Sequence, residues 1–178
     1  METVKLWDKY FRVSYPASEI KADIERLAKD INNDLKSETR PLFISVLNGS
    51  FIFTADIIRL IEFPCEVSFI KLASYEGTES TGAVSELIGL TENIEGRTIV
   101  ILEDIVDTGI TLGKLIDTLK KKNPKSIKIA TLLYKPESYK GKVNIDYVGR
   151  KIPNDFIVGY GLDYDGLGRN LADIYTLI

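Results

Sequence analysis

The chain has 178 residues, enough for about one compact domain with its own hydrophobic core, and we expect residues 1–178 to form one domain. Its 23 basic and 26 acidic side chains give a net charge of −3, which argues against a protein held mainly by the nucleic-acid backbone. The lack of histidine excludes a Ser-His-Asp triad, a Cys-His pair, histidine-ligated zinc and an imidazole base. The chemistry must therefore use carboxylates, lysine, arginine, hydroxyls, backbone amides or a hard metal ion.

Neither export nor membrane insertion is expected. The first residues carry charges where a secretory signal would need an apolar stretch. The longest uncharged run, Pro41 to Ala55, is too short to span a membrane. The single cysteine, Cys65, excludes an internal disulfide and suits a reducing compartment. These features predict a cytoplasmic protein with neither a membrane nor a nucleic-acid partner.

Apolar spacing along the chain predicts alternating helices and strands. Residues 18–36 have an apolar residue every three or four positions, which predicts an amphipathic helix capped by Ser18. The near-continuous apolar run 41–47 predicts a strand buried on both faces, and residues 51–61 return to helical spacing. Further along, we expect strands at 66–72, 98–102 and 126–134, and a helix at 111–122.

This alternation is typical of an α/β fold with a mainly parallel sheet. Residues 74–92 interrupt it, because the segment is too long and too polar for a tight connection, and we interpret it as a mobile lid or a solvent-facing loop. From Pro153 onward the chain is rich in aromatic residues and glycine. We expect that tail to form a strand and a small cap over one end of the sheet.

The strongest chemical signal follows the predicted strand 98–102. Glu103 and Asp104 come directly after it, and Asp107 lies three residues further on. Ligands of open α/β sheets bind at the carboxyl ends of strands, so the position favours a binding site. Adjacent carboxylates there suit sugar hydroxyls or a magnesium-bound substrate.

The segment after Asp107 has the composition of a phosphate-binding loop. Gly109 and the hydroxyls of Thr108 and Thr111 stand where a helix is predicted to begin, and backbone amides at a helix N-terminus bind anions. The plain alternative, in which Asp107 or Thr108 only caps the helix, gives no reason for three acids after an all-apolar strand. A Walker loop and a dinucleotide fingerprint are both absent.

The motif and four further segments resemble a known family. Leu102 to Thr111 resembles the phosphoribosyl pyrophosphate signature of the type I phosphoribosyltransferases. Within that group, the chain resembles the hypoxanthine-guanine phosphoribosyltransferases in four segments, in the family's order: Leu47 to Ser50, Ser74 with Tyr75, Leu133 to Lys135, and Val158 to Asp165 with Arg169.

The resemblance implies a fold and a reaction. The fold is a mainly parallel central sheet of about five strands flanked by helices, with a small hood from about residues 1–15 and 150–178. The reaction is purine salvage, in which the phosphoribosyl group of phosphoribosyl pyrophosphate passes to hypoxanthine or guanine, giving IMP or GMP and pyrophosphate. It also implies Mg²⁺ as the cofactor and a homodimer or homotetramer.

The same resemblance implies roles around the sugar and its 5′-phosphate. Asp107 is the catalytic residue, since it would accept the proton from N7 of the purine. Glu103 and Asp104 would hold the ribose hydroxyls and the magnesium bound to them. The 5′-phosphate would lie on the loop formed by Thr108, Gly109, Ile110 and Thr111.

Pyrophosphate would be bound by Leu47, Asn48 and Gly49, in a loop whose first peptide is commonly cis in this family, and by Arg169. Some family members carry lysine where this chain has Asn48. A direct cation on pyrophosphate is lost there, so Arg169 and backbone amides must do more.

The purine site and its cover complete the implied machinery. Lys135 would donate to the purine O6, Phe156 would stack on the ring, and Ile157 would meet it through its backbone. Asp163 would coordinate a second magnesium. A flexible lid beginning at Ser74 and Tyr75 would close over the site and exclude water.

Two other functions stay open at this stage. A regulatory protein of the same fold could sense phosphoribosyl pyrophosphate or nucleotides without turnover, although a sensor would not need a proton acceptor at Asp107. A transferase of the same family could act on xanthine or a pyrimidine base.

Overall fold

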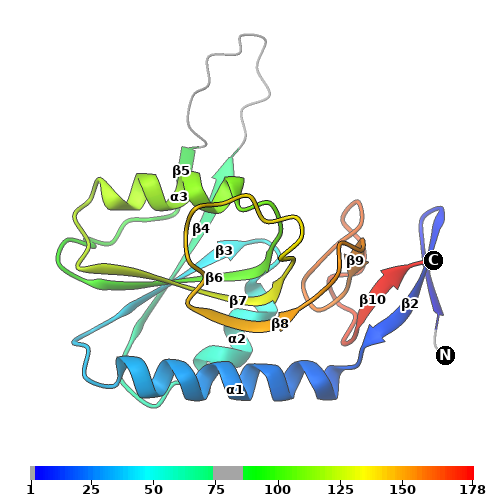
Figure 1. Cartoon of the computed structure of the whole chain (residues 1–178), viewed down its shortest axis with the longest axis horizontal. Coiled ribbons are helices and arrows are strands. Elements are labelled where there is room, and N and C mark those ends of the chain that lie inside the picture. Colours follow the sequence, from blue (N-terminus) through cyan, green and yellow to red (C-terminus); the bar gives the residue numbers. More distant parts are fainter. Residues whose placement is uncertain (1–2, 74–85) are drawn as a thin grey trace, which may run out of the picture.

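Two sheets and three helices make up the described part of the chain, residues 3–73 and 86–178 of a computed structural model (Figure 1). In chain order the elements are β1 (Thr3–Leu6), β2 (Lys9–Tyr15), α1 (Ala17–Leu35), β3 (Leu42–Leu47), α2 (Phe51–Ile58), β4 (Glu66–Ala73), β5 (Glu86–Ile88), β6 (Thr98–Val106), α3 (Ile110–Lys120), β7 (Ser126–Tyr134), β8 (Tyr147–Lys151), β9 (Ile157–Val158) and β10 (Ile174–Leu177).

The larger sheet has the order β5-β4-β3-β6-β7-β8. Strands β4, β3, β6, β7 and β8 are parallel, and only the edge strand β5 runs antiparallel among these described strands. The predicted α/β fold with five parallel strands is therefore confirmed.

Helices cover both faces of this sheet, with α1 and α2 on one side and α3 on the other (Figure 1). The strand side chains alternate between two cores, as the pleat requires: Phe43 packs with α1 and α2, whereas its neighbours Leu42 and Ile44 pack with α3. Strand β3 is thus buried on both faces, as its apolar run predicted. Each fully buried side chain of this kind contributes about 1.5–3 kcal/mol.

Helix α1 buries the apolar stripe that its spacing predicted, namely Ile20, Ile24, Leu27, Ala28, Ile31 and Leu35. Its start differs from the prediction, because the helix begins at Ala17 after Pro16 and Ser18 is not its cap. The backbone N–H of Ala17 instead donates to a carboxylate oxygen of Asp173, at 2.7 Å. A residue of the tail therefore caps the first helix.

Replacing Asp173 by alanine is expected to destabilise the protein by about 1 kcal/mol, because the N–H of Ala17 loses its acceptor and the helix N-terminus loses a favourable negative charge. Urea unfolding followed by circular dichroism measures the change. Asp117→Ala, an exposed change on α3, is the control and should shift the midpoint little. Equal shifts for the two variants would contradict the capping role.

Several predicted boundaries are wrong. Helix α2 ends at Ile58, short of residue 61, and α3 spans Ile110–Lys120 where 111–122 was expected. Strand β6 was expected to end at Leu102 but continues through the acidic residues to Val106. Strand β5 lies in the stretch 74–92 that was interpreted as a loop, and β8 was not predicted. The predicted lid residues Ser74 and Tyr75 lie outside the described residues.

Both chain ends build the smaller antiparallel sheet, whose order is β1-β2-β10-β9. It lies beside the larger sheet, near the N-terminal end of α1 (Figure 1). Its own core contains Leu6, Phe11, Val158 and Tyr175. The expected hood from the chain ends is confirmed. None of the helices that the structure describes is long and apolar enough to cross a membrane.

Candidate active site

A cavity of about 360 Å³ lies between the larger sheet and the tail, next to the carboxyl ends of β3, β6 and β7. It is lined by Gly49, Asp104, Ile105, Asp107, Lys135, Phe156, Ile157, Leu162, Asp163 and Arg169. All but Ile105 and Leu162 are residues that the resemblance implied. Segments far apart in the sequence thus meet around one cavity.

A second, smaller cavity of about 130 Å³ lies where β6 leads into α3. It is lined by Glu103, Ile105, Val106, Asp107, Thr108, Gly109, Thr111 and Leu112. Ile105 and Asp107 line both cavities, so the two are adjacent. Ile110 begins the helix with an exposed side chain and lines neither of these two cavities.

Gly109 shapes the loop of the smaller cavity. It is the N-cap of α3 with a φ of 76°, and a Cβ there would lie 2.3 Å from the ring of Tyr139. The N–H of Lys140 donates to the carbonyl of Thr108, at 3.1 Å. The alternative in which Asp107 or Thr108 is the N-cap is therefore wrong, although Thr108 Oγ1 accepts a long 3.5 Å bond from the N–H of Ile110.

Glu103 and Asp104 are adjacent in β6, so their side chains point to opposite faces of the sheet and line different cavities. Glu103 is only 8% exposed, and burial together with the charge of Asp104 raises its pKa well above the usual range. Burial also raises the pKa of Asp104 to about 6, against the lowering effect of its bond from the N–H of Ile105.

Neither Glu103 nor Asp104 forms an ion pair with lysine or arginine in the part of the chain that the structure describes. Glu103 is buried and Asp104 is partly buried, and two carboxyl groups so close together resist full ionisation without compensating charge or hydrogen-bond donors. A cation or sugar hydroxyls would provide that compensation.

The turn between β3 and α2 approaches Asp104 very closely. A Cβ on Gly49 would lie 1.6 Å from Asp104 Oδ2, so any larger residue here would force this carboxylate or the turn to move. The Leu47–Asn48 peptide that precedes it is cis, as the resemblance implied. Leu47 and Asn48 do not line the 360 Å³ cavity, so this turn reaches it through Gly49.

Lys135 and Asp107 form an ion pair at the lining of the cavity, with Lys135 Nζ 3.0 Å from Asp107 Oδ2. Lys135 follows β7 and is only 7% exposed, in contrast to the usual solvent-facing lysine. Its backbone N–H donates to the carbonyl of Val106 at 3.0 Å, which ties the ends of β6 and β7 together. A donor and a proton acceptor therefore stand side by side.

Phe156 presents an aromatic ring at the edge of the cavity and is 47% exposed. Tyr164 packs edge-on against it, with ring centroids 5.8 Å apart, and Phe11 of β2 lies 6.2 Å away. The hydroxyl of Tyr164 donates to Asp8, at 2.9 Å. The hood thereby supports Phe156 from behind and leaves part of its ring free.

Asp163 and Arg169 line the same cavity as Asp104 and are bound to each other, with 2.7 Å between Arg169 Nη2 and Asp163 Oδ1. Arg169 Nη1 also donates to the carbonyl of Gly161, at 2.7 Å. The N–H of Gly166 donates to Asp163, at 2.8 Å. A cationic and an anionic side chain are thus held at the same wall of the cavity.

No group of three or more histidine, cysteine, aspartate or glutamate side chains comes close enough to ligate a metal within residues 3–73 and 86–178. Asp104 and Asp163 nevertheless line the same cavity. Magnesium prefers oxygen ligands, and enzymes usually bind it through one or two carboxylates together with substrate phosphates. The carboxylates of this wall have the donor chemistry that Mg²⁺ requires.

Comparison with known proteins identifies the family. A model of the phosphoribosyl transferase domain matches residues 15–165. The chain is 42% identical over 167 residues to the hypoxanthine-guanine phosphoribosyltransferase of Mycobacterium bovis, covering 90% of this chain and 83% of the relative. The chain belongs to the hypoxanthine-guanine phosphoribosyltransferase family.

Other members of the family agree with this assignment. The hypoxanthine-guanine phosphoribosyltransferase of Staphylococcus epidermidis is 44% identical over 161 residues, covering 87% of this chain and 89% of the relative. A crystal structure of a hypoxanthine phosphoribosyltransferase from Staphylococcus aureus superposes with a TM-score of 0.86 at 37% identity, covering 94% of this chain and 91% of that one. The prediction of a phosphoribosyltransferase enzyme of purine salvage is confirmed.

Sequence reasoning missed Ile105 and Leu162 in this phosphoribosyltransferase, because isolated apolar residues give no sign that they face a cavity. Tyr160 was treated as an ordinary core aromatic, and the structure does place it in the core, at 8% exposed. That residue stands between Gly159 and Gly161, both with positive φ, in a segment whose neighbours line the cavity. The flanking glycines were the available signal that this segment forms tight turns next to the cavity.

Proposed function

We propose that the 360 Å³ cavity is where this chain transfers the phosphoribosyl group of phosphoribosyl pyrophosphate to hypoxanthine or guanine, giving IMP or GMP and pyrophosphate. The observation that carries the proposal is the Lys135–Asp107 pair, 3.0 Å apart, beside the free ring of Phe156. A donor, an acceptor and an aromatic surface are what a purine base requires.

In this proposal the purine lies on Phe156, and base stacking of this kind contributes about 1–3 kcal/mol. Lys135 donates to O6, and Ile157 meets the ring through its backbone. Donation to O6 makes the purine more acidic, so Asp107 can accept the proton from N7 as the new glycosidic bond forms. Both side chains line the same cavity, which supports this division of roles.

The sugar and its phosphates take the remaining walls. The 5′-phosphate lies in the 130 Å³ cavity against Thr108, Gly109 and Thr111, at the positive end of α3, and Ile110 would contribute only its backbone amide. The ribose hydroxyls meet Glu103 and Asp104. Pyrophosphate lies between Arg169 and the turn formed by Leu47, Asn48 and Gly49. This placement is supported by the fact that Gly49 and Arg169 line the same cavity.

Mg²⁺ belongs to the proposal as a partner of the substrate phosphates. Asp104 and Glu103 would hold one ion through the ribose, and Asp163 would hold a second. The bound ion would stabilise the charge that develops on departing pyrophosphate. The chain's own contribution is carboxylate oxygens on two sides of the site.

Two wider features complete the proposal. We infer a cytoplasmic location from the lone Cys65, which suits a reducing compartment. We infer a homodimer or homotetramer as well. Exposed apolar side chains on the α2 side of the molecule, Phe51, Val67 and Phe69, offer an apolar surface for a second copy.

Incubating the protein with phosphoribosyl pyrophosphate, Mg²⁺ and each base in turn tests the function through the absorbance of the product. We expect IMP and GMP to form far faster than any product from xanthine or a pyrimidine. Product from xanthine or a pyrimidine alone would replace the proposed bases. Tight binding of phosphoribosyl pyrophosphate without product from any base would favour the regulatory sensor.

A further inference from the structure

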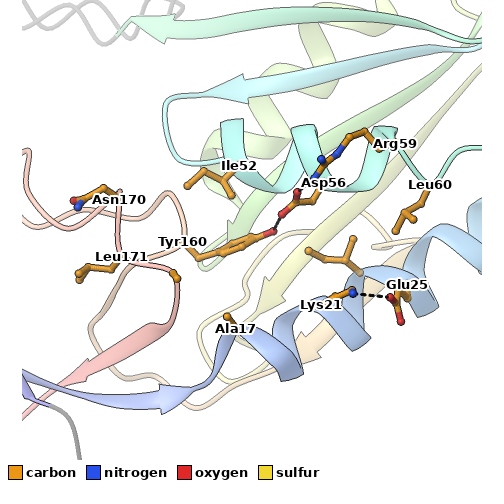
Figure 2. A pocket seen from close by; sticks show the side chains of 12 residues that line it. Ala17, Lys21, Glu25, Ile52, Asp56, Arg59, Leu60, Tyr160, Asn170 and Leu171 are labelled. Carbon is orange, nitrogen blue, oxygen red and sulfur yellow. Dashed lines mark hydrogen bonds and ion pairs between the residues drawn. The ribbon is translucent and has the colours of Figure 1, made fainter.

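A further cavity, of about 510 Å³, lies behind the tail and away from Asp107 and Lys135. Figure 2 shows it between α1, α2 and the tail, with the ring of Tyr160 reaching across toward Asp56. Ile24 and Ile52 contribute apolar walls. The charged residues at its rim are paired with one another, Lys21 with Glu25 and Asp56 with Arg59.

Tyr160 bridges this cavity with a single polar contact. Its hydroxyl donates to Asp56 Oδ2 on α2, and its ring is 8% exposed. Burial, and then the bond to Asp56, raise the pKa of Tyr160 above its usual value, so the hydroxyl keeps its proton throughout the physiological range. One side of the ring faces the cavity and the rest packs in the core, so the bond to Asp56 adds a directional link between the tail and α2 to that packing.

At the other end of Tyr160 the backbone leads directly into the active site. The backbone N–H of Tyr160 donates to the carbonyl of Leu171, at 2.8 Å, and the N–H of Gly161 donates to the carbonyl of Arg169, at 3.0 Å. A Cβ on Gly161 would lie 2.1 Å from the carbonyl oxygen of Gly49. The residue after Tyr160 is thus pressed against the turn that approaches Asp104.

Asp56 lies on α2, the helix that begins immediately after this turn, with Ser50 as its N-cap. Buried hydroxyls hold the start of this helix: Ser50 Oγ donates to Val46, at 2.5 Å, and Thr54 Oγ1 donates to Ser45, at 2.8 Å. The Tyr160–Asp56 bond therefore connects the segment that carries Asp163 and Arg169 with the helix that carries the Gly49 turn.

We propose that Tyr160 and Asp56 form a positioning pair that holds Arg169 and Asp163 against the Gly49 turn, and so sets the affinity of the enzyme for the pyrophosphate group of phosphoribosyl pyrophosphate. Neither side chain lines the substrate cavity. The pair acts mainly on one half of the site, since Lys135 follows β7, and Phe156 is separated from Tyr160 by β9 and packs against Phe11 and Tyr164. The inference rests on the proposed placement of pyrophosphate.

Tyr160→Phe removes only the hydroxyl and tests the pair. We expect the KM for phosphoribosyl pyrophosphate and the calorimetric Kd for magnesium pyrophosphate to rise about tenfold, which corresponds to about 1.4 kcal/mol. The KM for hypoxanthine should stay within about twofold, because the purine contacts are untouched. Asp56→Ala, which removes the acceptor, should produce the same split, and the double variant should add little to either single change.

Tyr147→Phe is the matched control. Tyr147 is also buried, at 5% exposed, and donates to a helix carboxylate, Asp34, at 3.0 Å, but it joins β8 to α1 outside the site. It should lose stability like Tyr160→Phe and keep both KM values. The proposal is overturned if Tyr160→Phe leaves pyrophosphate binding unchanged, or if Tyr147→Phe weakens it equally.

Experiment can disprove the proposed function and the positioning pair separately. If the wild-type enzyme formed no IMP or GMP, the proposed function would be wrong, while calorimetry with magnesium pyrophosphate would still measure the effect of Tyr160→Phe. If the wild-type enzyme were active and additive effects appeared in the double variant, the positioning pair alone would be wrong.

Discussion

Asp107→Asn is expected to lower turnover about 10²- to 10⁴-fold while leaving the binding of IMP nearly intact. The amide keeps the size and hydrogen-bonding capacity of the carboxylate, but it cannot accept the purine proton. The side chain lines both adjacent cavities and lies 3.0 Å from Lys135 Nζ, so its loss affects the centre of the proposed site. Steady-state rates and calorimetric titration with IMP measure the two quantities.

The same variant also leaves Lys135 without its anionic partner, and the kinetics distinguish that effect. A displaced Lys135 would raise the KM for hypoxanthine, whereas a lost proton acceptor lowers kcat. Asp165→Asn, an exposed change in the nearby tail, serves as the control and should retain full turnover. Unchanged turnover in Asp107→Asn would exclude Asp107 as the proton acceptor.

Gly49→Ala is expected to reduce kcat/KM about 100-fold or more while the protein still folds. The new Cβ would lie 1.6 Å from Asp104 Oδ2, so the carboxylate or the turn must move. Gly49 does not have a positive φ, so the conflict created by alanine comes from this contact and not from the backbone conformation. The side chain of Asp104 can rotate more easily than the sheet can shift, so the loss falls on the site.

Gly113→Ala provides the matched control for that experiment. A Cβ at Gly113, within α3, would meet nothing within 4 Å, and alanine there should stabilise the helix by about 1 kcal/mol without changing activity. Thermal unfolding and steady-state kinetics of both variants give the comparison. Full activity in Gly49→Ala would mean that Asp104 is not needed in its present position.

Periodicity predicted the helices and inner strands well because one or both faces are buried. The six buried positions of α1 and the whole of β7 follow directly from apolar spacing. The end of β6 could not be found in this way, since a buried strand is not expected to contain Glu103 and Asp104. Strand β8 contains Gly149, Arg150 and Lys151, so it lacks the apolar pattern from which a strand is predicted.

The site residues with distinctive chemistry could be predicted, whereas their supports could not. Asp107, Lys135 and Arg169 could be assigned from motifs in the sequence, and the structure brings them to one cavity. The cap that Asp173 provides for α1 and the bond between Tyr160 and Asp56 join segments 156 and 104 positions apart. Local sequence carries no information on such pairings.

The pairing of β2 with β10 also has a consequence for how the protein acquires its activity. Phe156, Asp163 and Arg169 stand on a segment that ends in β10, and β10 pairs with β2 in a contact of very high sequence separation. Such contacts form slowly, because a long loop must close before they stabilise the chain. We therefore expect catalytic competence to develop late in folding, after the larger sheet and its helices have formed.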